Sequence, residues 1–399
     1  MISKAFVFID GLEASPVVCA KIAYDHRNNS CQFVYGKSYL ARKDAFALDP
    51  INLPLSENTY STKYDHGLFG ALNDAGADSW GKQVILSLHT TKPKNELEFL
   101  LAGSGMGVGA LVFSLSSTGS KRKHSKNTLG DIPVLLKGKD AILNDKEVSD
   151  EAKKAFEYGS SMGGARPKTL INDNGIAYLA KFNRDNDLFN TVRVEHASMQ
   201  MLSELPCRVA PTRVCETQDG DVLLVERFDV QHEKPICHFL SANSIFNTKK
   251  VNQSLTTSTY TYGFLAQYIL KHGSEPKDAH DLYYRMVFNA YIGNTDDHAR
   301  NHALMYIFES QGWRLTPAYD VLPIGNSRLH GIGMGDDGRH ATDENLLSQS
   351  ERFGLKQFKA KRILAEVKAL AGEWQHYFKR YGVTDQDMNR LGGIIPNIS

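Results

Sequence analysis

The sequence has few cysteines, no long apolar run and almost no net charge. Its five cysteines form neither a CxxC pair nor the spacing of a zinc site. Scattered cysteines of this kind predict free thiols in a reducing compartment, which excludes a disulfide scaffold. No apolar stretch reaches the length of about 18 residues that a membrane-spanning helix needs. The N-terminus reaches the acidic Asp10 too soon for a signal peptide. We therefore expect a cytoplasmic protein without a membrane partner.

The charge balance excludes a second class of protein. Lysine and arginine total 46 and aspartate and glutamate total 45, so the formal net charge is +1. A protein whose main task is to coat nucleic acid needs a strong basic excess. The run SKRKHSK at 120–126 is basic, but it lies in the polar stretch 114–127, which we interpret as a solvated linker or surface loop. That run is the first place to look for phosphate contacts.

Hydrophobic periodicity divides the chain into a β-rich beginning, a central hairpin and a helical end. Residues 1–114 have the pattern of strands and turns, with one helix expected near 79–90. The segments 169–171 and 176–180 flank Asp173-Asn174-Gly175 and predict a β-hairpin with a tight turn. The other expected elements are a charged surface helix at 140–158, helices around 194–205 and 282–291, a buried strand at 222–225 and a last long helix around 363–378. This order predicts an α+β fold with a small N-terminal module and a larger core of two lobes.

The densest polar cluster directly follows the helix at 282–291 and has the sequence GNTDDHARN over 293–301. Within it, Asp296 and Asn301 have the Asp-x-x-x-x-Asn spacing of a protein-kinase catalytic loop, and Asp320 follows after a short apolar segment. Phosphoryl transfer needs one carboxylate near the acceptor hydroxyl, and an amide oxygen and a second carboxylate on Mg²⁺. A solvated polar loop with helix-capping roles would contain the same residues, so the cluster alone does not decide.

Three further signals precede this cluster. The glycine-rich stretch Gly159 to Thr169 lies beside the hairpin, where backbone N–H groups can bind phosphates. It is not a Walker A loop, because Ala165 stands where the lysine should be, and a generic glycine turn is the simpler interpretation. Lys181 ends the hairpin and Glu195 lies in the next helix, as in the pair that holds the α- and β-phosphates in kinases. The segment ERFD at 226–229 stands where a kinase has the hinge whose backbone contacts adenine.

The order of these parts carries more information than any one of them. Glycine-rich loop, strand lysine, helix glutamate, hinge, Asp-x-x-x-x-Asn and a final aspartate is the order found in protein kinases. A second glycine-rich run at 103–109 resembles a nucleotide loop more closely, but no strand lysine and paired glutamate follow it at kinase spacing. We interpret that run as a flexible loop of the N-terminal module.

Seven stretches of the chain match motifs of one known family. They are FGALNDAGADSWG (69–81), VGALVF (108–113), SSMGGARPKT (160–169), YLAKF (178–182), VERFD (225–229), GNTDDHARN (293–301) and LTPAYD (315–320). In these stretches the chain resembles the HipA family of bacterial toxin serine/threonine kinases, from about residue 5 to about residue 380. The resemblance implies a two-lobed protein-kinase-like core with a β-rich N-terminal module and a mainly helical C-terminal lobe. The expected limits are 1–115 for the module, 116–150 for a basic linker and connecting helix, and 151–399 for the core, with its N-lobe elements ending near 230.

The resemblance also implies a role for each matching residue. Asp296 would be the catalytic base, while Asn301 and Asp320 would bind Mg²⁺. Lys181, supported by Glu195, would contact the phosphates of ATP. The other residues that would bind ATP are Ser161, Gly163, Gly164 and Lys168 in the glycine-rich loop, and Glu226 and Phe228 at the hinge.

The expected reaction is transfer of the γ-phosphoryl group of Mg·ATP to a protein hydroxyl. We expect His298 to pack and orient the catalytic loop rather than to exchange protons. The resemblance implies a protein substrate, by analogy an aminoacyl-tRNA synthetase, and a small helix-turn-helix antitoxin through which DNA would be contacted indirectly. Two alternatives stay open: a phosphotransferase with a small-molecule acceptor, and a pseudokinase that acts as a binding or co-repressor subunit. Bound ATP without phosphoryl transfer would favour the pseudokinase.

Ser161 matches the autophosphorylated serine of the family, with Ser160 as the neighbouring alternative. A phosphate adds a charge of about −1.5 to −2 inside an anion site, so we expect it to expel the loop and switch the kinase off. Mass spectrometry of protein incubated with Mg·ATP is expected to find the phosphate on Ser161. Its absence from both serines in active enzyme would contradict this switch.

Overall fold

The structure is a computed structural model that describes residues 2–63, 67–120, 127–144, 146–246, 259–325 and 329–396. Its beginning is β-rich, because a five-stranded antiparallel sheet has the order β4-β3-β2-β1-β5. The strands are β1 (Ile2–Ile9), β2 (Val17–Asp25), β3 (Ser30–Tyr35), β4 (Tyr60–Thr62) and β5 (Leu111–Ser114). Buried side chains alternate with more exposed ones along β3, which is the pattern of a strand with one covered face.

Short helices complete this N-terminal part. They are α1 (Lys37–Leu40), α2 (Gly70–Asn73), α3 (Ser79–Leu88) and α4 (Glu96–Ala102). The helix expected near 79–90 is confirmed as α3, whereas α4 was not predicted. Asn95 begins α4, and its side chain accepts a hydrogen bond from the Glu98 N–H. Such a cap compensates the unpaired amides at a helix start and stabilises even a short helix.

The prediction of one charged helix over 140–158 is wrong, because the chain forms two helices in this region. They are α5 (Ile132–Leu143) and α6 (Asp150–Glu157), preceded by the short η2 (Leu129–Asp131). Ser149 caps α6 by accepting a hydrogen bond from Ala152 N, so a new helix begins at that residue. Trp80 of α3, Leu135 of α5 and Phe156 of α6 share one buried cluster. The basic residues 121–126 lie outside the described residues.

The central sheet has four antiparallel strands in the order β6-β7-β9-β8. Its strands are β6 (Lys168–Asp173), β7 (Ile176–Phe182), β8 (Thr212–Thr217) and β9 (Gly220–Glu226), and α7 (Thr191–Leu202) connects β7 to β8. The predicted hairpin is confirmed, with Asn174 (φ 52°) and Gly175 (φ 83°) both left-handed in its turn. That backbone is the one that matches the twist of a two-residue hairpin. The predicted helix and the predicted buried strand are confirmed as α7 and β9, whereas β8 was not predicted.

A second sheet and the helices follow. The sheet has the order β12-β13-β14, with β12 (Cys237–Ser241), β13 (Ala303–Ile307) and β14 (Gly312–Leu315). A small hairpin of β10 (Val230–Gln231) and β11 (Lys234–Pro235) precedes β12. The helices are α8 (Ala242–Phe246), α9 (Tyr262–His272), α10 (Lys277–Ile292), α11 (Asp343–Ser348), α12 (Gln357–Gly372), α13 (Trp374–Arg380) and α14 (Asp385–Leu391), with the short η3 (Ala299–Asn301) and η4 (Ser350–Phe353).

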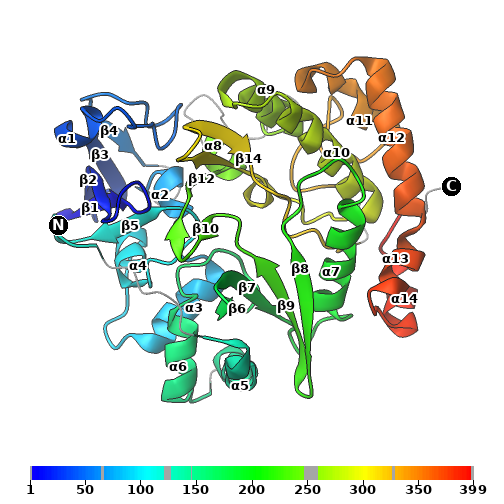
Figure 1. Cartoon of the computed structure of the whole chain (residues 1–399), viewed down its shortest axis with the longest axis horizontal. Coiled ribbons are helices and arrows are strands. Elements are labelled where there is room, and N and C mark those ends of the chain that lie inside the picture. Colours follow the sequence, from blue (N-terminus) through cyan, green and yellow to red (C-terminus); the bar gives the residue numbers. More distant parts are fainter. Residues whose placement is uncertain are drawn as a thin grey trace.

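The α+β fold, with a β-rich beginning and a mainly helical end, is confirmed. In Figure 1 the N-terminal sheet lies at the left of the molecule, α10 to α14 lie at the right, and the central sheet lies between them. The helix expected around 282–291 is α10. The prediction of one long helix around 363–378 is wrong, since α12 and α13 are separate helices that meet at Glu373. The domain limits near 115 and 150 stay predictions.

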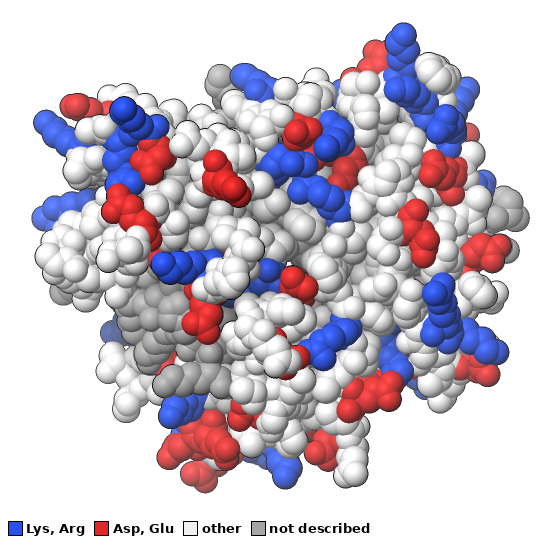
Figure 2. Space-filling model, viewed as in Figure 1, with Lys and Arg blue, Asp and Glu red and all other residues white. Residues whose placement is uncertain are grey.

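The surface agrees with the small net charge. On the face drawn in Figure 2, acidic and basic side chains are interspersed. Within the described ranges, we find no helix with the length and apolarity needed to cross a membrane.

Asp74 joins the N-terminal part to the rest of the chain. Its carboxylate accepts hydrogen bonds from the Ser241 N–H (2.7 Å), the Ser241 hydroxyl (2.7 Å) and the Ser244 hydroxyl (2.8 Å). Ser241 ends β12, and Ser244 lies in α8. Removal from water raises the pKa of Asp74 to about 6, even though these three donors favour the ionised form. The contact therefore depends on both burial and protonation.

We expect Asp74→Ala to lower the free energy of unfolding by about 2–3 kcal/mol, because buried donors on β12 and α8 lose their acceptor. Urea denaturation measures this, with Asp150→Ala in the fully exposed first turn of α6 as the control. The folded-state pKa lies above the ordinary value of 3.8. The stability that this raised pKa contributes is thus complete below pH 3.8 and is lost as pH rises through about 6. An Asp74→Ala variant with wild-type stability and pH dependence would contradict this role.

Candidate active site

Three of the predicted residues meet at the end of β7. The Lys181 ammonium lies 2.6 Å from a Glu195 carboxylate oxygen and 2.9 Å from an Asp320 carboxylate oxygen. Glu195 comes from α7 and is buried, whereas the Asp320 side chain is half-exposed. Burial disfavours the charge on Lys181, but Asp320 and Glu195 outweigh it and raise the pKa of this amine. The site therefore contains a permanently charged amine with two carboxylates.

Lys168 brings a second amine to the same place. It stands opposite Lys181 in the β6–β7 pairing, so the two side chains share one face of the sheet. Its ammonium donates a 2.8 Å hydrogen bond to the Gly163 carbonyl oxygen. Burial, and then the charge of Lys181, lower the pKa of Lys168 to about 8. Two amines beside a glycine-rich loop make an environment that favours an anion.

Asp320 has an unusual backbone conformation. Its φ of 60° lies in the left-handed region, which is uncommon for any residue other than glycine. Partial desolvation would raise the pKa of its carboxyl, but the charges of Lys181 and Lys168 hold the pKa well below its ordinary value. The preceding Ala318 pairs with the segment after α7, since its N–H donates to Arg208 O (2.7 Å) and its carbonyl accepts from Ala210 N (2.9 Å). This pairing fixes where the Asp320 carboxylate lies.

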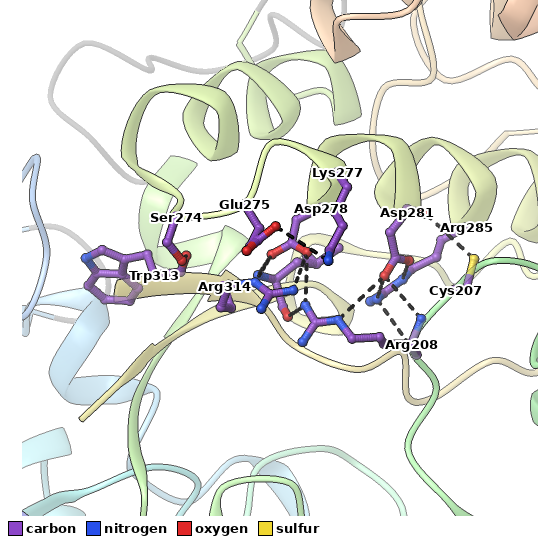
Figure 3. Close-up of polar contacts among 11 residues, drawn as sticks. Cys207, Arg208, Ser274, Glu275, Lys277, Asp278, Asp281, Arg285, Trp313 and Arg314 are labelled. Atoms are coloured by element: carbon purple, nitrogen blue, oxygen red, sulfur yellow. Dashed lines mark hydrogen bonds and ion pairs between the residues drawn. The ribbon is translucent and has the colours of Figure 1, made fainter. Parts of the chain in front are cut away.

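A charged network connects Arg208 and β14 to α10, as Figure 3 shows. Asp278 accepts two hydrogen bonds from Arg314 of β14, at 2.8 and 3.0 Å, and one from Arg208 at 3.3 Å. Asp281, about one turn further along α10, accepts two from Arg285 at 2.7 and 2.9 Å. Asp278, Asp281 and Arg285 are buried. The strand that precedes Asp320 is therefore bound to a helix whose other end leads into the predicted catalytic loop.

The predicted catalytic loop begins where α10 ends at Gly293, whose φ is 74°. Asp296 is exposed, whereas its neighbour Asp297 is fully buried. Partial desolvation raises the pKa of Asp296, and the nearby charge of Asp320 raises it further, while His298 opposes the rise. Asn301 is buried, and its amide donates a long hydrogen bond of 3.4 Å to the Asp296 carbonyl oxygen. Asp296 is thus the carboxylate of this loop that an acceptor can reach.

Asn301 and Asp320 line the same small cavity, whose volume of about 10 Å³ matches about one water molecule. One amide oxygen and one half-exposed carboxylate are donors of the kind that Mg²⁺ prefers when phosphates and water complete its shell. Among the described residues, no group of three or more His, Cys, Asp or Glu could hold a metal. A magnesium ion shared with ATP does not require such a group, so the residues present fit it.

A buried polar cluster supports the loop 293–301 from the side of the core, and we did not predict it from the sequence. Asp297 accepts a hydrogen bond from the Tyr262 hydroxyl and lies 2.7 Å from His302 Nε2. Tyr262 also lies 2.9 Å from that nitrogen and accepts a 3.1 Å hydrogen bond from Asn289. Burial opposes ionisation of Asp297, but His302 and Tyr262 hold its pKa below the ordinary value. The pair of adjacent aspartates in TDDH was the available signal. Because neighbouring side chains point in different directions, an exposed Asp296 implies that Asp297 points to the core.

His298 follows these two aspartates, and its orienting role stays a prediction. Its ring nitrogen Nδ1 has no hydrogen-bond partner within the described part of the chain. The ring is partly buried and lies close enough to Asp296 and Asp320 to affect the ionisation of both.

The glycine-rich loop connects α6 to β6, and both of its serines are buried. Ser160 is 1% exposed and Ser161 is 4% exposed. Gly163 faces open space, whereas Gly164 has a φ of 103° and a side chain there would meet the Lys168 amine at 2.1 Å. The serine hydroxyls are hydrogen-bonded to the run 103–109 of the N-terminal part, at 3.1 Å from Ser104 N and 3.1 Å from Gly105 N. The run that we expected to be a flexible loop is thus fixed by specific contacts.

The segment predicted to be the hinge lies at the end of β9. Glu226 N donates to the Pro211 carbonyl oxygen at 2.9 Å, and the Phe228 ring stacks on Tyr319, next to Asp320, with 5.9 Å between ring centres. Arg227 and Asp229 form a buried ion pair at 2.6 Å, which the sequence did not predict. The hinge and the Asp320 segment are therefore in direct contact.

A second cavity, of about 70 Å³, lies where the N-terminal part meets the catalytic loop. Asp78, Lys82 and Glu96 line it from α3, its cap and α4, and Arg300 lines it from the loop. Arg300 Nη1 lies 3.7 Å from an Asp78 oxygen. The N-terminal part thus borders the candidate site directly.

The adjacent aspartates allow a sharp test of these assignments. Asp297→Asn is expected to lower the free energy of unfolding by about 3 kcal/mol, because it disrupts a buried charge with its partners. Asp296→Asn, which replaces an exposed carboxylate, is expected to change it by less than about 1 kcal/mol. Urea denaturation of both variants measures the difference, and equal effects would contradict the division between a supporting and an accessible carboxylate.

Comparison with known proteins identifies the family. The model of the HipA-like C-terminal domain matches residues 160–374, and that of the HipA N-terminal domain matches residues 16–114. The HipA of a toxin–antitoxin system from Shewanella oneidensis MR-1, solved with HipB and its operator DNA, is 14% identical over 96% of this chain and 94% of that one, with a TM-score of 0.66. The Helicobacter pylori proinflammatory kinase CtkA is 16% identical over 57% of this chain and 93% of that one, with a TM-score of 0.38, which is too low to support a conclusion. On the two family matches and the shared fold, this chain belongs to the HipA family.

Proposed function

We propose that this chain is a cytoplasmic serine/threonine protein kinase of the HipA type, which transfers the γ-phosphoryl group of Mg·ATP to a protein hydroxyl. The observation that carries the proposal is the contact of Lys181 with both Glu195 and Asp320. Strand lysine, helix glutamate and metal-binding aspartate are the groups that a kinase must bring together around the phosphates. Membership of the HipA family supports the same function.

The proposed roles come from the family resemblance, and the positions of the side chains support them. Lys181, held by Glu195, binds the phosphates, and Lys168 with the backbone of Gly163 and Gly164 encloses them from the loop side. Ser161 would lie in the same loop. Glu226 and Phe228 contact adenine at the hinge. When bound, Mg²⁺ would neutralise the phosphate charge, with Asn301 and Asp320 as its protein ligands.

Asp296 is the proposed base. The acceptor hydroxyl oxygen forms a bond to the γ-phosphorus, the bond from that phosphorus to the bridging oxygen of ADP breaks, and the hydroxyl proton passes to the Asp296 carboxylate. The exposure of Asp296 allows an acceptor to approach, and its raised pKa makes it a better proton acceptor than an ordinary aspartate. Asp297 and His302 keep the loop in position without touching the substrate.

The remaining proposals concern modification and partners. We propose that Ser161, or Ser160 next to it, is autophosphorylated, and that a small helix-turn-helix antitoxin binds the protein and contacts DNA. The Shewanella oneidensis HipA was solved with HipB and operator DNA, which supports such a partner. An aminoacyl-tRNA synthetase is the proposed acceptor by analogy with the family alone. The proposed units are 1–115, 116–150 and 151–399.

Transfer of labelled γ-phosphate from Mg·ATP, with and without a cell extract, tests the function. The wild type is expected to label itself or an extract protein, and Asp296→Asn is expected to reduce the rate by about 10²–10⁴-fold because the proton acceptor is lost. Asp320→Asn is expected to lose transfer as well. Asp150→Asn, at the exposed start of α6, is the matched control and should be as active as the wild type.

The outcomes separate the alternatives. No label from any variant, with Mg·ATP binding intact, would favour a pseudokinase subunit and overturn the proposal. Label on a small molecule of the extract rather than on a protein would favour the small-molecule phosphotransferase.

A further inference from the structure

We propose that the run Gly103 to Gly109 of the N-terminal part is a clamp, which holds the phosphate-binding loop (159–167) in its nucleotide-binding position and connects it to the hinge. The clamp would set the affinity for Mg·ATP and shield Ser161. This inference rests on the proposed function, and it assigns a positioning role to a glycine-rich run outside the kinase-like core.

The first support is a set of buried hydrogen bonds between the clamp and the loop. Gly105 N donates to the Ser161 hydroxyl at 3.1 Å, and Ser104 N donates to the Ser160 hydroxyl at 3.1 Å. The Ser104 hydroxyl donates to the Tyr158 carbonyl oxygen at 3.0 Å. Ser104, Ser160 and Ser161 are 1%, 1% and 4% exposed, so no water competes for these groups. The clamp thus binds successive residues at the start of the loop.

The second support is the close approach of glycines in the N-terminal part to the loop. A Cβ atom on Gly103 would lie 2.4 Å from the Ser161 hydroxyl oxygen. From α3, a Cβ on Gly81 would lie 2.6 Å from the Ser160 carbonyl oxygen. These glycines therefore permit an approach that any side chain would prevent. Two separate segments of the N-terminal part therefore fit closely against the phosphate-binding loop.

The third support is the other end of the clamp, which is bound to the hinge. Arg227 donates hydrogen bonds to the carbonyl oxygens of Met106 (3.1 Å) and Gly107 (2.9 Å). Gly109 N donates to Asp229 at 2.6 Å, and Arg227 and Asp229 are paired with each other. The clamp therefore contacts both segments that would enclose ATP, the phosphate-binding loop and the hinge.

A phosphate on Ser161 and the closed clamp exclude each other. The hydroxyl oxygen has less space beside Gly103 than one methyl group needs, whereas a phosphate adds three oxygens and a charge of about −1.5 to −2. Ser161 can therefore be modified only after the clamp has released the loop. The N-terminal part would in this way control how fast the modification occurs.

Gly103→Ala in the full-length chain tests the clamp. The backbone at Gly103, with φ −64° and ψ 169°, suits alanine, so the close contact is with the Ser161 hydroxyl. We expect the affinity for Mg·ATP to fall about tenfold, as for a lost buried hydrogen bond, and the amides of 159–164 to exchange hydrogen faster. Gly119→Ala is the control, because a Cβ there would meet nothing within 4 Å.

A double-variant cycle separates the clamp from a general loss of stability. Because the methyl group acts through the Ser161 hydroxyl, Gly103→Ala/Ser161→Ala should bind Mg·ATP as Ser161→Ala does alone. Ser104→Ala, which removes the hydrogen bond to Tyr158 without adding an atom, should also weaken binding, and Ser116→Ala on the exposed surface should not. Wild-type affinity and exchange in both Gly103→Ala and Ser104→Ala, or additive effects in the cycle, would overturn the clamp.

The clamp and the proposed function fail in different ways. If the wild type binds no Mg·ATP, the kinase proposal fails, yet faster exchange at 159–164 in Gly103→Ala, suppressed by Ser161→Ala, would still support the clamp. If Mg·ATP is bound and transferred but Gly103→Ala changes neither affinity nor exchange, the kinase stands and the clamp is wrong.

Discussion

The buried ammonium of Lys181 constrains the whole core. A charge removed from water is tolerated only with partners in good geometry, and its partners here come from distant parts of the chain. Glu195 lies on α7, and Asp320 lies beyond β14. The central sheet, α7 and the second sheet must therefore be in place together before this charge is compensated. The half-exposed side of Asp320 is what leaves the cluster open to a ligand.

Further buried charges extend this constraint into the helical part. The Asp278 and Asp281 network fixes β14 and the Ala318 segment to one end of α10, and the Asp297 cluster fixes the loop that follows its other end. One helix of the fold thus positions both the accessible Asp296 and the backbone that leads to Asp320. Packing determines the overall shape of this part of the protein. Ion pairs and hydrogen bonds determine the relative position of the Asp296 and Asp320 carboxylates, because they allow few other arrangements of the two segments.

The sequence predicted best what neighbouring residues decide. The hairpin at 168–182 followed from the Asn174-Gly175 turn, and the order of Lys181, Glu195, Asp296 and Asp320 followed from motif spacing. The structure brings Lys181, Glu195 and Asp320 into contact, while the catalytic and ATP-binding roles of the site residues stay proposals. Long-range effects were missed. β8 has mostly half-buried residues without alternation, and it is a strand because β9 pairs with it.

Two further expectations were wrong. The break at Glu373 does not interrupt the apolar periodicity, so one helix was expected where two are present. The run 103–109 has the composition of a flexible loop, and only its contacts with Ser160, Ser161 and Arg227 make it rigid. Composition describes the freedom of an isolated segment, whereas a folded protein can remove that freedom through a partner far away in sequence.

The left-handed backbone of Asp320 places two contributions to stability in opposition at a single residue. A conformation of this kind costs about 1–2 kcal/mol for a residue with a Cβ atom, and glycine would remove most of that cost. Glycine would, however, also remove a carboxylate that compensates the buried ammonium of Lys181, so an ion pair maintains the strained backbone at this position. An engineered, heat-resistant form of this protein has to gain its stability elsewhere and leave this strain in place.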